Sequence, residues 1–174
     1  IELDNITGHE LPCFFRQSSS AEVNPKFDAP SLEKEIKHNE HNTWGVVGDN
    51  QIGDTVEFRT ITTVPNPYGY DTYEYIIHDT MSDGLTLQEG FTVKVNDQVV
   101  LDDSYLSLVN TDGHSCTFEL KIDILNAIED GVLEVGDQLY TYYNATLNEE
   151  AFIYDEGKHN NKAYLEYSNN PYDD

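Results

Sequence analysis

The stretch Asn161-Lys162-Ala163-Tyr164-Leu165-Glu166-Tyr167, near the end of the chain, says most about the fold. Side chains alternate between the two faces of a strand, so Asn161 heads a row of apolar residues on one face. The other face carries charged residues and a tyrosine. A carboxamide in an apolar row costs free energy unless it finds a polar partner. The stretch therefore predicts a half-buried strand whose first inward residue meets another polar group.

A second stretch, near the front of the chain, contains the same anomaly. In Pro30-Ser31-Leu32-Glu33-Lys34-Glu35-Ile36, the side chain of Lys34 shares the inward face with Leu32 and Ile36. An inward lysine and an inward asparagine at opposite ends of one β domain indicate that the two side chains meet. The alternative is an edge-strand lysine that extends its ammonium group to water.

Between these two stretches the chain alternates between short apolar runs and turn residues. Strands are expected at Leu32–Lys37, Thr55–Val64, Tyr73–Asp79, Phe91–Val95, Gln98–Leu101, Tyr105–Leu108, Cys116–Ile122, Gln138–Leu147 and Lys162–Tyr167. A polar loop is expected at residues 38–42, and one short helix over Asp123–Asp130, before Gly131. Many short strands separated by Gly, Asn and Asp turns are typical of an all-β sandwich of two sheets.

Residues 1–29 differ from the rest of the chain. They have weak periodicity, a serine run at residues 18–20, and prolines at positions 12 and 25. We interpret them as an N-terminal arm or linker, followed by a single sandwich domain over residues 30–174.

The charge of the chain excludes several kinds of partner. The 174 residues include 33 Asp and Glu against 9 Lys and Arg, a formal net charge of −24. Phosphate contacts need clustered cations, so we expect no binding to nucleic acid or to an anionic membrane surface. No apolar stretch approaches the roughly 20 residues that span a bilayer, so membrane insertion is not expected either.

The candidate chemistry follows from burial. Desolvation lowers the pKa of a buried lysine and favours its neutral form, which is a competent nucleophile. Attack by the Lys34 amine on the carboxamide of Asn161 would form an amide bond and expel ammonia. Such a step needs a proton donor, and a buried carboxylic acid with a raised pKa can supply it.

Asp79 is the candidate acid. On the strand predicted around it, Tyr73, Tyr75 and Ile77 share its face, so the carboxyl ends an inward aromatic and aliphatic row. An alternative is a turn residue that bonds its own backbone. Three other acids alternate onto the outward face of their strands and are excluded: Glu57, Glu74 and Glu166.

Five motifs occur in an order that points to a known family. They are Lys34 within Pro-Ser-Leu-Glu-Lys, Ile52–Phe58, Tyr75–Leu85, Tyr142–Asn148 and Asn161–Pro171. Over about residues 30–174 the chain resembles the isopeptide-forming middle domain of backbone subunits from Gram-positive, sortase-assembled fimbriae. That resemblance implies an immunoglobulin-like sandwich related to the collagen-adhesin domains. It also implies that Lys34 and Asn161 form the crosslink and that Asp79 assists as the acid.

The resemblance has consequences for function. It implies a structural pilin domain in an extracellular, cell-wall-anchored fibre, with neighbouring subunits joined by sortase. Self-crosslinking happens once per molecule, so the chain is not expected to be an enzyme or to need a cofactor. The linkage lysine of the family falls on Lys26, in Val23-Asn24-Pro25-Lys26-Phe27. Asn24 stands where the family has tyrosine, so an ordinary surface lysine is the alternative.

Other interpretations stay open beside this one. Tyr68-Gly69-Tyr70 and Tyr140–Tyr143 could stack on sugars in an adhesin that binds a host glycan or matrix protein, or could simply pack. No nucleophile–base pair or paired-carboxylate motif favours a hydrolase.

Two further sets of residues give little information about metal binding or disulfide formation. His38, Glu40 and His41 have a loose metal-ligand look, but they lie in a predicted loop and we expect no metal there. Cys13 and Cys116 are too few for a disulfide framework and are compatible with one bridge or two free thiols.

Overall fold

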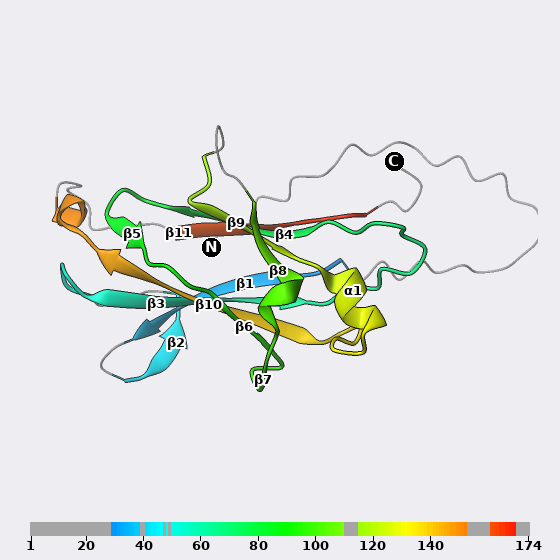
Figure 1. Ribbon diagram of the computed structural model, residues 1–174. Helices are drawn as coiled ribbons and strands as arrows, with labels where there is room; N and C mark the ends of the chain where they lie inside the picture. Colours follow the sequence, from blue (N-terminus) through cyan, green and yellow to red (C-terminus); the bar gives the residue numbers. More distant parts are fainter. Residues whose placement is uncertain are drawn as a thin grey trace, which may run out of the picture.

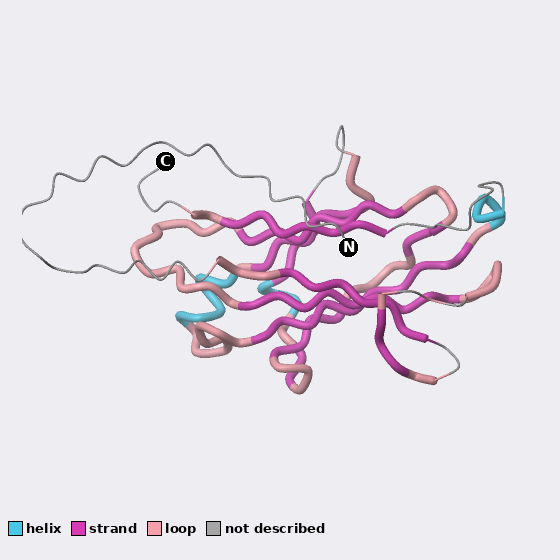
Figure 2. Tube along the Cα trace, turned by 180° about the vertical axis from the view of Figure 1, so that it is seen from behind, coloured by secondary structure: helices cyan, strands magenta, loops and turns pink. Residues whose placement is uncertain are grey.

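Two antiparallel sheets form the two layers of the molecule. The computed structural model describes residues 29–38, 41–46, 48, 50–109, 115–152 and 161–169. One sheet has the strand order β2-β1-β3-β10-β6-β7, with β5 also paired to β10, and the other has the order β11-β4-β9-β8. Figures 1 and 2 show the layers from opposite sides. The predicted two-sheet sandwich is confirmed.

The elements in chain order are β1 (Leu32–His38), β2 (Thr43–Gly45), β3 (Thr55–Thr63), β4 (Tyr75–Met81), β5 (Leu85–Leu87), β6 (Thr92–Val95), β7 (Val99–Val100), η1 (Asp103–Tyr105), β8 (Leu106–Val109), β9 (Phe118–Ile122), α1 (Ile124–Glu129), β10 (Gln138–Leu147), η2 (Glu149–Phe152) and β11 (Asn161–Tyr167).

The long central strands place the core between the layers. In β10 every second residue is buried, and the same alternation runs along β3. The inward side chains of β10 pack against apolar residues of the opposite sheet, with Phe118 and Tyr143 in an edge-to-face contact at 5.0 Å between ring centroids. The bounds predicted for β10 are those observed.

The short helix α1 lies at one end of the sandwich, where it connects the sheet of β9 to the sheet of β10 (Figure 1). Asp123 caps it, because its side chain accepts a hydrogen bond from the backbone N–H of Asn126. Gly131, with φ of 71°, follows its end. The predicted helix is confirmed.

The structure also differs from the prediction at several elements. β2 and β5 were not predicted, and His38, expected as the first residue of a polar loop, belongs to β1. β4 starts two residues later than expected and continues to Met81. Asp79 therefore lies inside a strand, and the turn interpretation of this residue is wrong. β7 and β9 are shorter than predicted, at two and five residues.

Strand β4 is buried on both of its faces. Tyr75, Ile77 and Asp79 point between the sheets, whereas Ile76 and His78 point outward but are also buried. β4 pairs with β11 on one side and β9 on the other, so it lies inside its sheet. A strand in this position has no solvated face that could show a simple polar–apolar alternation.

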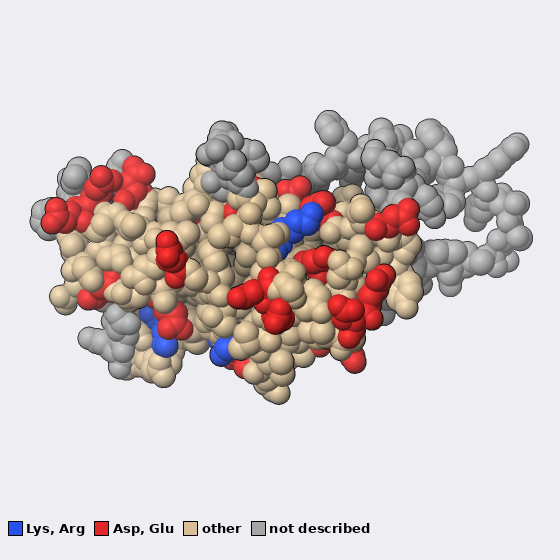
Figure 3. Space-filling view, viewed as in Figure 1, with Lys and Arg blue, Asp and Glu red and all other residues tan. Residues whose placement is uncertain are grey.

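The surface of the molecule is acidic, as the composition predicts. Figure 3 shows Asp and Glu scattered over the visible face, with few Lys and Arg. On the outer faces of the sheets several cations pair with acids, as in Lys37–Glu57 at 3.1 Å and Lys121–Glu74 at 2.7 Å. Among the described residues, no helix has the length and apolar character needed to cross a membrane.

Candidate functional site

Lys34 lies between the two sheets. It belongs to β1, where Leu32 on the same face is also buried, and only 5% of Lys34 is exposed. Its amine donates a hydrogen bond to the carboxylate of Asp79. The same nitrogen lies 5.5 Å from the ring centroid of Phe58 and 5.6 Å from that of Tyr143. The amine is therefore enclosed by aromatic rings and has no route to water of the kind an edge-strand lysine uses.

Asp79 is the centre of this cluster, and it is fully buried. Its Oδ2 atom accepts hydrogen bonds from Lys34 and from the hydroxyl of Tyr143, the latter at 2.6 Å. Its Oδ1 atom is also buried but makes no hydrogen bond within the described part of the chain. One oxygen of the carboxyl thus binds the lysine and the tyrosine, and the other faces the interior without a hydrogen bond of good geometry to a described residue.

Asn161 is the third predicted member. It is the first residue of β11, in the inward row that it shares with Ala163, and Ala163 is paired with Asp79 in the sheet. Both polar atoms of its amide are buried, and neither makes a hydrogen bond of good geometry to a described residue. The amide is nevertheless close enough to lower the pKa of the Asp79 carboxyl and the pKa of the Tyr143 hydroxyl, against the larger effect of burial. The two strands that carry Lys34 and Asn161 also contact each other across the sandwich.

The electrostatics of the cluster favour uncharged groups. Burial lowers the pKa of Lys34 from 10.5 to about 8, because desolvation outweighs the attraction of Asp79. Burial likewise raises the pKa of Asp79, although Lys34, Tyr143 and Asn161 act in the opposite direction. Both shifts make it easier for the amine to pass its proton to the carboxylate. The product of that transfer is a neutral amine beside a protonated acid.

Tyr143 is the member of the cluster that the sequence analysis missed. Burial raises the pKa of its hydroxyl well above the ordinary value, so it stays a hydrogen-bond donor to Asp79. The available signal was the alternation along β10, which places Tyr143 inward with Leu139 and Thr141. Alternation gives the face of a residue but does not identify the residue that it meets in the other sheet.

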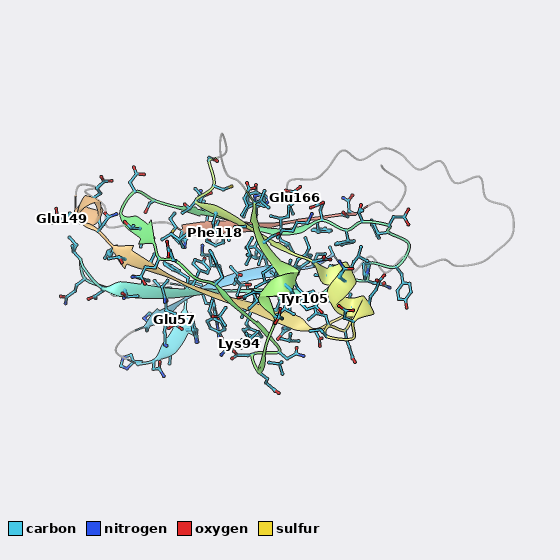
Figure 4. All side chains as sticks on the ribbon, in the orientation of Figure 1. Glu57, Lys94, Tyr105, Phe118, Glu149 and Glu166 are labelled. Carbon is cyan, nitrogen blue, oxygen red and sulfur yellow. The ribbon has the colours of Figure 1, made fainter. Side chains whose placement is uncertain are left out.

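The acids that were excluded lie on the outer faces, as predicted. Glu57 pairs with Lys37, Glu74 with Lys121, and Glu166 with His78. Figure 4 shows Glu57 and Glu166 on the outside of the layers. Of the described acids considered for the role, Asp79 is the one that meets Lys34.

Three other sequence predictions have different outcomes. Lys26 and Cys13 lie outside the described residues, as does nearly all of the arm at residues 1–29. Cys116 carries a free thiol. Of the exposed tyrosines considered, Tyr68 is 85% exposed, whereas Tyr140 packs beside Arg59 on the outer face of its sheet.

Comparisons with known proteins agree with this fold. The model of the Gram-positive pilin backbone subunit 2, Cna-B-like domain, matches residues 52–171. The pilus backbone RrgB of Streptococcus pneumoniae is similar with a TM-score of 0.60 and 24% identity, over 82% of this chain and 53% of that one. BcpA, the major pilin subunit of Bacillus cereus, has a TM-score of 0.56 and 14% identity, over 80% of this chain and 35% of that one.

A C-terminal fragment of the major pilin GBS80 of Streptococcus agalactiae has a TM-score of 0.57 and 18% identity, over 83% of this chain and 51% of that one. The chain thus spans about half or less of the length of these structures. No match was found among curated proteins. The structural neighbours show the fold, an immunoglobulin-like sandwich similar to domains of pilus backbone subunits.

The family follows from the sequence match, which covers more than half of the chain. The protein belongs to the Gram-positive pilin backbone subunit 2 family, with a Cna-B-like domain.

Proposed function

We propose that this chain is a domain of a pilus backbone subunit whose sandwich is closed by an autocatalytic amide bond between Lys34 and Asn161. Asp79 serves as the acid. The sandwich comprises residues 30–174, and residues 1–29 form the arm that precedes it. The observation that carries the proposal is the buried carboxamide of Asn161, which makes no hydrogen bond of good geometry to a described residue although it lies beside a lysine–aspartate pair.

The reaction needs only groups of the cluster. The Lys34 ammonium gives one proton to Asp79, and the neutral Nζ then attacks Cγ of Asn161. The protonated carboxyl of Asp79 polarises the amide oxygen and delivers a proton to the leaving nitrogen. A C–N bond forms between Nζ and Cγ, the bond from Cγ to Nδ2 breaks, and ammonia leaves. The proton delivered by Asp79 completes that ammonia, and Asp79 takes up the second proton lost by Nζ, so it ends the reaction as a protonated carboxyl.

The role of the bond would be mechanical. Lys34 lies on β1, which comes first along the chain, and Asn161 lies on β11, at the edge of the other sheet. The bond would therefore join the two layers and connect the beginning of the domain to its end. Unlike a disulfide, an amide bond is not cleaved by thiol reductants. Each chain reacts once, so the protein acts as a structural component rather than as an enzyme. Sortase would join neighbouring subunits into a cell-wall-anchored fibre, with Lys26 as the linkage lysine.

The experiment that tests the crosslink is intact-mass measurement of the recombinant chain. We expect the wild-type chain to be lighter than its sequence mass by one ammonia. Lys34→Ala and Asn161→Ala should have their full sequence masses, because one reacting partner is missing. Asp79→Asn should also have its full sequence mass, because the amide that replaces the carboxyl cannot take up and return the proton.

Matched controls come from the same two strands. Lys37→Ala changes an outward lysine of β1, and Lys162→Ala changes an exposed residue beside Asn161. Both variants should lose one ammonia as the wild type does. A wild-type chain with its full mass after complete folding would contradict the proposal.

A second role, binding of a host glycan or matrix protein, would need open aromatic rings. Tyr68 offers one, while Tyr142 packs against Trp44 at 5.7 Å between ring centroids. The structural role is therefore the stronger proposal. Saturable binding of a soluble glycan, lost in Tyr68→Ala, would support the adhesin role.

A further inference from the structure

A second polar cluster lies on the opposite, outward face of the same strand β4. His78 is only 4% exposed, and Glu119 beside it on β9 is 2% exposed. The two residues are paired in the sheet, and His78 Nδ1 lies 3.2 Å from Glu119 Oε1. The thiol of Cys116, two residues before β9, lies 3.7 Å from the same nitrogen. An imidazole, a thiol and a carboxylate thus converge on one point.

The distances within this cluster suit a metal ion. The three ligand atoms all lie within 4.8 Å of one another. Zinc bonds are about 2.0–2.1 Å to nitrogen or oxygen and about 2.3 Å to sulfur, so the ligand atoms around a tetrahedral zinc lie about 3.3–3.6 Å apart. The separations of His78 from Cys116 and from Glu119 fall within a few tenths of an ångström of that range.

The surroundings orient the imidazole for this role. The other ring nitrogen, Nε2, lies 2.7 Å from the carboxylate of Glu166. A proton shared with that carboxylate leaves Nδ1 as the unprotonated nitrogen, and a carboxylate behind the ring is the usual second partner of a zinc-binding histidine. Tyr164 stacks on the ring at 4.2 Å between centroids, with an interplanar angle of 6°. Figure 4 places Glu166 on the outer side of the sheet.

We propose that His78, Cys116 and Glu119 form a zinc site, with water as the fourth ligand and Glu166 as the positioning residue. The mixture of imidazole, thiolate and carboxylate selects zinc over calcium and magnesium, which take oxygen ligands. The competing account is an imidazolium that bridges the carboxylates of Glu119 and Glu166. In that account the thiol only hydrogen-bonds to the imidazole and to the Tyr164 hydroxyl, whereas in the zinc site it is a ligand.

The site would tie β4 to β9 directly, and β11 through Glu166. It is independent of the amide crosslink, since His78 and the neighbouring Asp79 point to opposite faces of β4. Sequence reasoning did not find it because the residues are distant along the chain and are brought together by strand register.

The test is zinc binding by the full chain. The reduced chain is stripped with a chelator and titrated with Zn²⁺ in excess Ca²⁺, which saturates nonspecific sites on the acidic surface. We expect one zinc per chain, and with Co²⁺ in its place a thiolate-to-metal charge-transfer band. Cys116→Ser should lose the band and most of the affinity. Glu166→Gln should keep the band but weaken zinc binding about 10- to 100-fold.

Controls separate the proposed site from other ligands. Cys13→Ser removes the other thiol, and His41→Gln removes an exposed imidazole; both should bind zinc as the wild type does. Far-UV circular dichroism checks that Cys116→Ser folds. The proposal is overturned if the folded wild-type chain takes up no stoichiometric zinc, as the imidazolium account requires. It is equally overturned if Cys116→Ser binds zinc as tightly as the wild type.

Discussion

At the scale of single residues, the molecule holds a lysine, an acid and a carboxamide where water cannot reach them. Burying one charge without a partner would cost several kcal/mol, and pairing offsets only part of that cost. The Lys34–Asp79 pair is retained inside aromatic walls although replacement by apolar residues of similar volume is often neutral or stabilising. The proposed crosslinking reaction would account for the presence of this pair in the core.

The lowered pKa of Lys34 predicts a pH dependence in a chain that cannot crosslink. In Asn161→Ala, the folded state loses the Lys34 proton near pH 8 and the unfolded state near pH 10.5. Between these values the unfolded state binds more protons, so the free energy of unfolding should rise with pH. The full gain is about 3 kcal/mol, from 1.36 kcal/mol per pKa unit.

Denaturant titrations between about pH 8 and 9.5 check this rise. Above that window the buried tyrosines act in the opposite direction, because burial raises the pKa of Tyr75 and Tyr143. The double variant Lys34→Met with Asn161→Ala keeps those tyrosines but lacks the amine. An equal rise in both chains would show that Lys34 is not the cause.

At the scale of elements, β11 is an edge strand, and its stability depends on how its first residue is held. Within the described residues it pairs with β4 alone, whereas β10 has partners on both sides. An edge strand opens at lower free energy than the strands inside a sheet. The proposed bond would attach the first residue of β11 to the other layer and so oppose that opening.

Hydrogen exchange should detect this attachment. We expect the amides of β11 to exchange faster in Asn161→Ala than in the wild type, with a much smaller change in β10. Lys162→Ala, which alters the same strand but keeps the crosslink, should behave as the wild type. Mass spectrometry of peptides from the two strands measures the difference, and equal exchange of β11 in all three chains would count against the bond.

The elements also show which parts of the fold the sequence could predict. β10 was predicted with its observed bounds because ten alternating residues carry a clear period of two. β2 and β5 have three residues each, too few to show a period, and they form because a neighbouring strand offers partners. Lys34 and Asn161 were found as anomalies in apolar rows. Tyr143 and the His78 cluster were missed because their meaning depends on cross-strand register.

At the scale of the whole molecule, the proposed bond would enclose most of the domain in a covalent loop. The chain-entropy model for crosslinks gives about 5 kcal/mol for a loop of this size, through restriction of the unfolded state. Tension applied to the two ends of the domain would pass from β1 to β11 through the bond. The strands between them would carry little of the load.

Denaturant unfolding of the wild type and of Asn161→Ala tests this estimate. We expect the variant to lose about 5 kcal/mol of unfolding free energy, with a larger m-value because its unfolded chain is less compact. The loss should be the same with and without a thiol reductant, since the bond is an amide. A reductant-sensitive difference would instead indicate a disulfide, and a difference below about 1 kcal/mol would argue against a closed loop.

The burial of β4 on both faces has a consequence for how this protein can change over evolution. Deleting or inserting one residue in this strand would turn Asp79 toward the surface and His78 into the interior, so both clusters would be lost in a single step. Substitutions can accumulate in the loops and on the outer face of the other sheet. In descendants that keep either cluster, the number of residues in Tyr75–Met81 and the face of the sheet to which each one points should stay the same.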